Sequence, residues 1–166
     1  MDKEQIKKNA EFLMKELPDM EIPGVAKIRC KYKKMVDFAK CIGITDKKYI
    51  GSEEEGIIAY PAFANSYTVK AFYTLFPSVK LVQDGLKRDL ALVPTKLLHT
   101  SNKYNWENCV PIKPGDALIA KGTFGKVWVH EESMRLFAEM LLTVKNQNDE
   151  LVCQITSGVA IAAGGY

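Results

Sequence analysis

The segment between Pro61 and Pro77 constrains the fold of this chain more than any other feature. Its apolar residues lie almost all the way round a helix, and a proline stands at each end, where a helix can begin or must stop. A helix of this kind either spans a membrane or is buried by protein on most sides. The segment is shorter than the roughly 20 apolar residues that a membrane span requires. We therefore expect a helix over 62–76 that other elements wrap.

The apolar residues of the C-terminal half follow a period of two, which is typical of strands. The strands predicted in this way cover 96–106, 117–129, 134–144 and 151–161, with a fifth at either 25–29 or 57–60. Long strands joined by short turns form an antiparallel sheet, and one face of such a sheet must be covered. The sequence therefore predicts an α+β fold, in which a curved antiparallel sheet of about five strands wraps around one long central helix.

Helical spacing of apolar residues also predicts an amphipathic helix over 3–17 and a short helix over 32–42. The stretch 78–95 contains Asp-Gly and Pro and is expected to be an irregular connection. No internal repeat or second domain is visible. We expect a single domain over 1–166, in which residues 1–22 form an N-terminal helical extension.

Composition excludes several classes of protein. The 166 residues include 23 Lys and Arg and 20 Asp and Glu, and this excess of +3 is too weak and too scattered to indicate a nucleic-acid partner. The four cysteines lack the spacing of a metal or redox motif, which favours free thiols in a reducing cytosol. Two histidines without further ligands predict no metal site. With no signal peptide or membrane span visible, we expect a cytoplasmic protein without a membrane partner.

Three segments carry a resemblance to a known family. They are residues 36–43 leading to Tyr49, residues 59–63 at the start of the central helix, and residues 97–99 followed by Lys-Pro-Gly-Asp at 113–116. In this order and spacing they resemble the MaoC-like dehydratases, or (R)-specific enoyl-CoA hydratases, of the type found in the N-terminal half of fatty-acid-synthase dehydratases. The resemblance implies the hot-dog fold. Within the third segment, Asp116 is expected to be a structural turn residue.

The resemblance also implies a reaction, the reversible loss of water from a 3-hydroxyacyl thioester. Active members carry an Asp and a His, with Asn-Pro between them, in the loop after the short second helix. In this chain Ile44 stands at the Asp position and Tyr49 at the His position, with Asp46 and Lys47 at the positions of Asn and Pro. An isoleucine transfers no proton, and a tyrosine is a poor base at neutral pH. Neither catalytic group is retained.

Two histidines remain as substitutes. His99 is the candidate replacement base, with Asp46 or Tyr49 nearby, and its alternative role is that of a hydrogen-bonded strand histidine at a subunit contact. His130 is expected near solvent at the end of a strand. By simple alternation, His99 would share a strand face with Leu97, Ser101, Lys103 and Asn105.

Substrate-binding residues follow from the resemblance as well. The start of the central helix would hold the thioester carbonyl, unless it is an ordinary buried helix terminus. The residues implied to line an acyl pocket, unless they are simply core, are Tyr60, Pro61, Ala62, Phe63, Tyr67 and Phe72. The acyl group would be carried as a thioester of coenzyme A or of an acyl carrier protein, and no further cofactor is expected. Residues that could meet phosphate groups of either carrier are Lys47, Lys48, Lys80, Lys87 and Arg88.

Three functions remain open at this point. The first is a dehydratase or hydratase subunit that shapes the acyl pocket while a partner MaoC-like subunit supplies the Asp/His pair. The second is a non-catalytic homodimer that binds acyl-CoA. The third is a hot-dog thioesterase, which would need a carboxylate such as Asp46 or Glu53 to direct water. One fold hosts several chemistries and does not decide among them.

Overall fold

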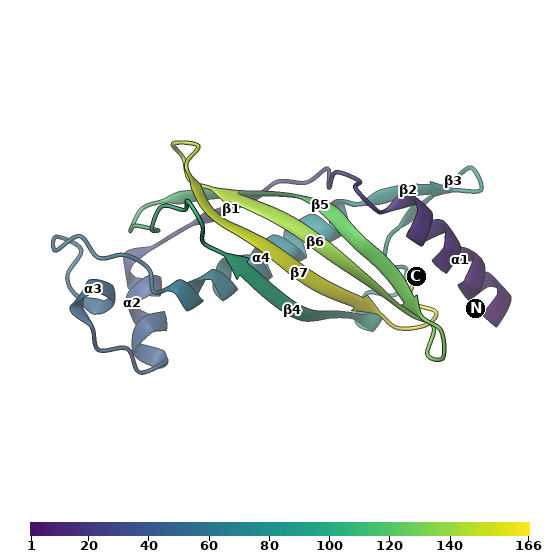
Figure 1. Cartoon of the computed structure of the whole chain (residues 1–166), viewed down its shortest axis with the longest axis horizontal. Helices are drawn as coiled ribbons and strands as arrows, with labels where there is room; N and C mark the ends of the chain where they lie inside the picture. The colour runs from purple at the N-terminus through teal and green to yellow at the C-terminus, as the bar shows by residue number, and fades with distance from the viewer.

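The computed structural model describes residues 1–166 (Figure 1). No helix in it combines the length and the apolar character that a membrane crossing requires. Its elements along the chain are α1 (Lys3–Glu16), β1 (Ala26–Arg29), α2 (Tyr32–Cys41), α3 (Lys47–Ile50), the 3-10 turn η1 (Pro61–Phe63), α4 (Ala64–Leu75), η2 (Phe76–Ser78), β2 (Lys80–Gln83), β3 (Leu86–Asp89), η3 (Pro94–Lys96), β4 (Leu97–Asn105), β5 (Ala117–His130), β6 (Arg135–Lys145) and β7 (Leu151–Ile161).

Five strands form the main sheet, in the order β1-β5-β6-β7-β4, and every neighbouring pair is antiparallel. The predicted five-stranded sheet is confirmed. The fifth strand is β1, and the alternative at 57–60 is not a strand, although the Ala59 N–H donates to the Ile112 carbonyl at 2.9 Å. This order leaves β1 and β4 at the two edges, where backbone groups on one side lack a partner strand.

The central helix is α4. Figure 1 shows it running along one side of the curved sheet, behind β6 and β7. The side chains on its buried side belong to Ala64, Tyr67, Thr68, Ala71, Phe72 and Leu75. The opposite side is open, and Tyr73 is 65% exposed. The arrangement confirms the hot-dog fold. The expectation that the helix is buried almost all the way round was wrong, because the single sheet of this chain covers only one side of it.

The predicted irregular connection over 78–95 is wrong in part, because β2 and β3 pair within it as a small antiparallel sheet. The turn between them is Asp84-Gly85, with φ of 54° and 78°. Positive φ at both central residues is the geometry of a two-residue hairpin turn, for which Asp-Gly is a favoured sequence. Lys80 and Asp89 form an ion pair at the open end of the hairpin.

A β-bulge in β4 changes which side chains share a face. The pairing of β4 with β7 shifts between His99 and Ser101, so Thr100 is an extra residue opposite β7. His99 is half-buried together with Asn102, whereas Ser101 and Lys103 are exposed. The expectation that His99 shares a face with Ser101, Lys103 and Asn105 was therefore wrong, since simple alternation fails across a bulge.

The N-terminal extension is tied to distant parts of the chain. Asp2 caps α1 by accepting a hydrogen bond from the Gln5 N–H at 2.8 Å. On the same helix, the Asn9 amide donates to the Tyr166 carbonyl at 3.0 Å and accepts from the Gln83 amide at 2.9 Å. Asn9 is buried, so these bonds satisfy its polar side chain and fix α1 against the hairpin.

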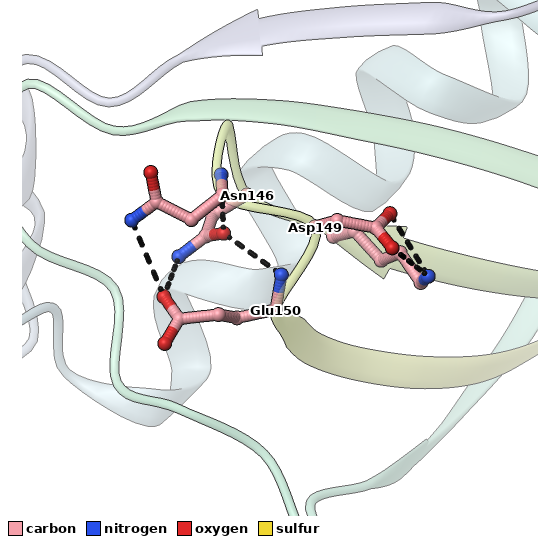
Figure 2. Close-up of polar contacts among 5 residues, drawn as sticks. Asn146, Asp149 and Glu150 are labelled. Atoms are coloured by element: carbon pink, nitrogen blue, oxygen red, sulfur yellow. Dashed lines mark hydrogen bonds and ion pairs between the residues drawn. The ribbon is translucent and has the colours of Figure 1, made fainter.

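The turn between β6 and β7 is held by its own side chains (Figure 2). The Asn146 Oδ1 accepts from the backbone N–H groups of Asn148 at 3.0 Å and Glu150 at 3.1 Å, and its Nδ2 donates to a Glu150 carboxylate oxygen at 2.8 Å. Lys145 pairs with Asp149 at 2.9 Å. Hydrogen bonds from Asn146 and Asn148 lower the pKa of Glu150. These contacts fix the register of β6 and β7, which have 11 residues each.

Candidate active site

The central helix begins at the surface. The turn η1 precedes it, and Pro61 occupies the first position, where its lack of an N–H costs nothing. Pro61 and Ala62 are exposed, and no side chain caps the backbone N–H groups of this end. The N-terminal end of a helix carries partial positive charge, which stabilises negative charge developing on a carbonyl oxygen.

The loop after α2 reaches this helix start without bringing a proton-transfer pair. Ile44, which the resemblance implies stands at the family's Asp position, is half-buried and its N–H donates to the Ala39 carbonyl at 3.0 Å. Asp46 is exposed and caps α3, accepting from the Lys48 N–H at 2.9 Å. Tyr49, which the resemblance implies stands at the His position, packs edge-on against Tyr60 with ring centroids 5.1 Å apart. The loop therefore contacts the helix start and holds no Asp/His pair.

His99 is held by two other residues. Its Nε2 lies 2.9 Å from the Asn102 Oδ1, and the Asn102 amide donates to the Asn65 Oδ1 at 3.3 Å. In this orientation the Asn102 oxygen is placed to accept a hydrogen bond from a protonated Nε2 of His99. The ring also lies against Phe72, with centroids 5.4 Å apart. Asn65 and Asn102 were missed from the sequence, because their contact depends on how β4 lies over α4.

The three residues considered for catalysis do not form one cluster. Tyr49 contacts Tyr60 immediately before the central helix, whereas His99 contacts Phe72, far along α4. His99 is also linked through Asn102 to Asn65 near the start of α4, but no contact joins it to Tyr49 or Asp46. Asp46 remains exposed as the cap of α3. His130 is exposed at the end of β5, as the sequence predicted.

The aromatic residues assigned to an acyl pocket pack against one another. Phe63, Tyr67 and Phe72 are 6%, 1% and 1% exposed. Phe38 contacts Phe63 edge-on at 5.6 Å between centroids, and Phe72 stacks on Phe76 at 5.5 Å. Burial raises the pKa of the Tyr67 hydroxyl, which has no hydrogen-bond partner. In this chain alone, these three residues belong to the core, whereas Tyr60 is half-buried at the helix start.

Asp116 is a structural residue, as predicted. It is buried, and its two carboxylate oxygens accept from the Lys113 N–H at 2.7 Å and from the Gln147 amide at 3.0 Å. Gly115 has φ of 89°, the left-handed conformation that the third position of this turn requires. The turn lies beside β1, where the Gly115 N–H donates to the Cys30 carbonyl at 2.8 Å.

A hollow of about 770 Å³ lies over the face of the sheet that points away from α4. It is lined by outward-facing side chains of four strands, among them Lys103, Lys121, Thr143, Gln154 and Thr156. None of the residues predicted for the active site lines it. The hollow is therefore not the predicted acyl pocket.

Comparison with known families assigns this architecture. Residues 20–155 match the family described as FAS1-like, dehydratase domain region. The match covers most of the chain, so the protein belongs to this family, and the resemblance to MaoC-like dehydratases is confirmed. A search of curated protein sequences gave no match.

Solved structures share the fold at low sequence identity. The HadBC (3R-hydroxyacyl-ACP dehydratase) complex from Mycobacterium tuberculosis is 15% identical, with 89% of this chain and 99% of that chain covered and a TM-score of 0.63. A MaoC-like dehydratase from Rhodospirillum rubrum is 16% identical, with coverage of 84% and 90% and a TM-score of 0.60. The (R)-hydratase from A. caviae is 12% identical, with coverage of 87% and 97% and a TM-score of 0.57. These similarities show the hot-dog fold.

Proposed function

We propose that this chain is a non-catalytic subunit of a 3-hydroxyacyl-thioester dehydratase, which in the reverse direction is an (R)-specific enoyl-thioester hydratase. Membership of the dehydratase family supports the reaction class. A second hot-dog subunit supplies the catalytic Asp and His. This chain contributes the start of its central helix and the surfaces beside it.

The observation that carries this proposal is the loop after α2. Loss of water from a 3-hydroxyacyl thioester requires a proton removed from C2 and a proton delivered to the hydroxyl leaving C3. Ile44 cannot exchange a proton, Asp46 is engaged as a helix cap, and Tyr49 packs on Tyr60. His99 is the only half-buried histidine, and its contacts are with Phe72 and Asn102 rather than with this loop.

The remaining residues suit a supporting role. The uncapped start of α4 offers partial positive charge to the thioester carbonyl, which becomes enolate-like when the C2 proton leaves. Tyr60, Pro61 and Ala62 surround this end, and the acyl chain would lie along this exposed end rather than within the packed aromatic core. In this assignment the chain binds and polarises the substrate, while the partner moves the protons.

The partner is expected to join at a sheet edge. β4 ends the sheet and carries unpaired backbone groups along nine residues, Leu97–Asn105. An edge of this length is commonly covered by another strand or by charge, and pairing with a second sheet would cover it. The similar HadBC structure is itself a complex, which supports assembly with another hot-dog subunit.

Hydration of crotonyl-CoA tests the proposal. The pure chain is expected to show no activity, and the chain co-expressed with a hot-dog subunit that retains Asp and His is expected to hydrate the substrate. His99→Ala in this chain should leave the activity of the complex within about twofold, because His99 does not contact the loop. Strong activity of the pure chain that His99→Ala abolishes would overturn the proposal and make His99 the base.

A restoration variant provides a second test on this chain. Ile44→Asp with Tyr49→His places the family's pair back at the helix start. Hydratase activity gained by the double variant, but by neither single variant, would support the assignment of this loop as the emptied catalytic position. A variant that folds and still shows no activity would indicate that the loop no longer presents these positions to substrate.

A further inference from the structure

The charges of the chain are unevenly distributed. Residues 27–40 contain six cationic side chains and one acidic side chain, Asp37, and so carry a charge of +5. The whole chain has a charge of +3, which leaves −2 for all remaining residues. We call these cationic residues the basic patch: Lys27, Arg29, Lys31, Lys33, Lys34 and Lys40.

The basic patch is not neutralised within the chain. All six side chains are exposed, and none takes part in an ion pair. The ion pairs of the structure all lie elsewhere and use Lys7, Lys8, Lys15, Lys80 and Lys145. Exposed cations gathered in one region without partners raise the local concentration of anionic ligands and their rate of association.

The basic patch lies next to the proposed substrate site. On α2, the lysines occupy the exposed side, opposite the buried Met35, Val36 and Ala39. The same helix contacts the start of the central helix through Phe38, whose ring meets Phe63 edge-on at 5.6 Å between centroids. Figure 1 shows α2 and α3 at one end of the molecule, near the N-terminal end of α4, and α1 at the other end.

We propose that the basic patch docks an acidic carrier protein that presents the acyl thioester on its phosphopantetheine arm. This inference rests on the proposed function and deepens it by selecting the carrier. The length of the basic patch favours a carrier protein over free coenzyme A. Lys33 to Lys40 span about 10 Å of helix, and Lys27 to Lys31 add about 13 Å of extended chain. The phosphates of free coenzyme A are confined to its one nucleotide. The acidic surface of a protein is large enough to cover the whole patch.

Charge complementarity of this kind mainly affects encounter and specificity. Opposite surface potentials steer association, and the effect weakens as salt shortens the screening length. Lys47 and Lys48 of α3 are also exposed, and the acidic run at 53–55 follows that helix along the chain. A thioester carried by an acidic protein is therefore expected to bind more tightly than the same acyl group on coenzyme A, with a strong dependence on salt.

Binding of two crotonyl thioesters tests this directly, on an acidic acyl carrier protein and on coenzyme A. The variant Lys33→Glu/Lys34→Glu/Lys40→Glu should weaken binding of crotonyl-carrier protein roughly tenfold or more at low salt. Its affinity for crotonyl-CoA should fall by a clearly smaller factor, because the compact phosphates of coenzyme A can meet only part of the patch. The matched control Lys3→Glu/Lys7→Glu/Lys15→Glu makes the same charge change on α1, at the other end, and should leave both affinities unchanged.

The outcomes separate this inference from the proposed function. If the α2 variant weakens both thioesters equally, the patch binds the phosphates of coenzyme A and the carrier-protein inference is wrong. If the variant leaves carrier-protein binding unchanged, or only crotonyl-CoA binds, the inference also fails while the proposed function stands. If neither thioester binds the wild-type chain alone or in complex with its partner subunit, both proposals are contradicted. Circular dichroism of the variants confirms that they are folded.

Discussion

The two sides of the central helix differ in what they present. The side facing the sheet is filled, with Phe63, Tyr67 and Phe72 buried. On the other side, at the start of the helix, the loop after α2 packs through the contact of Tyr49 with Tyr60, and no Asp/His pair lies there. Core packing therefore maintains the hot-dog fold. It does so independently of which residues stand at the catalytic positions. Substitutions on the two sides should therefore affect stability to very different degrees.

The largest effect is expected from the core side. Phe72→Ala should lower the free energy of unfolding by about 3–5 kcal/mol, because it removes a fully buried ring stacked on Phe76 and leaves a cavity. Urea denaturation measures this loss in the free energy of unfolding. The adjacent Tyr73→Ala is the control, since Tyr73 is 65% exposed and should lose only its edge-on contact with Phe72, about 0.5–1.5 kcal/mol. Equal losses for both variants would contradict the described packing of α4.

A buried turn should show the next effect. Asp116→Ala should cost about 1–3 kcal/mol, because the Lys113 N–H and the Gln147 amide lose their common acceptor in a buried site. Thermal or urea denaturation measures the change. Asp37→Ala, which removes an exposed carboxylate in α2, is the control and should change stability by no more than about 0.5 kcal/mol. A neutral Asp116→Ala would indicate that the turn does not need the carboxylate.

Two core thiols should make stability depend on alkaline pH. Burial, and for Cys30 also the nearby Asp116, raises the pKa of Cys30 and of Cys153 from 9.0 to about 12. Between these values the unfolded chain loses protons that the native chain keeps. Stability is therefore full below the unfolded pKa and falls as pH rises toward the folded pKa, by about 1 kcal/mol per pH unit for each thiol.

Urea denaturation at successive pH values above about 9 measures this slope. Cys30→Ala should make the slope shallower than in wild type. Cys41→Ala, which removes an exposed thiol, is the control and should leave the slope unchanged. Identical slopes in all three proteins would contradict the assignment to buried thiols.

The loop side should show the smallest effect. Tyr49→Ala removes a half-buried ring and its edge-on contact with Tyr60, worth about 0.5–1.5 kcal/mol beyond the buried area. Tyr49→Phe keeps the ring and should be nearly neutral, because no hydrogen bond of the Tyr49 hydroxyl is present. A loss from Tyr49→Ala as large as that from Phe72→Ala would erase the contrast between the two sides.

Much of the fold could be predicted from the sequence, because periodicity directly reports burial. The central helix and the strands at 117–129, 134–144 and 151–161 all follow from apolar spacing. The bulge at His99 could not be predicted, since it is set by pairing with β7 rather than by local sequence. The hairpin at 80–89 was missed although Asp84-Gly85 signalled it, because its strands are only four residues long.

The candidate site was less predictable. The expected loss of the catalytic Asp and His, at Ile44 and Tyr49, can be recognised only by comparing this loop with the pattern of the family. The link from His99 through Asn102 to Asn65 joins an edge strand to the central helix, so no spacing along the chain indicates it. The exposed side of α4 was also unforeseen, since apolar spacing does not say how many sides of a helix a single sheet covers.

The most direct test of the central claim compares the two subunits within one active complex. In the reconstituted dehydratase, replacing the Asp or His of the partner should abolish hydration of crotonyl-CoA. Replacing His99 or Asp46 of this chain by Ala should leave kcat within about twofold, since neither group moves a proton in the proposed reaction. Loss of kcat from His99→Ala with the complex intact, while the partner's Asp and His prove dispensable, would contradict the account.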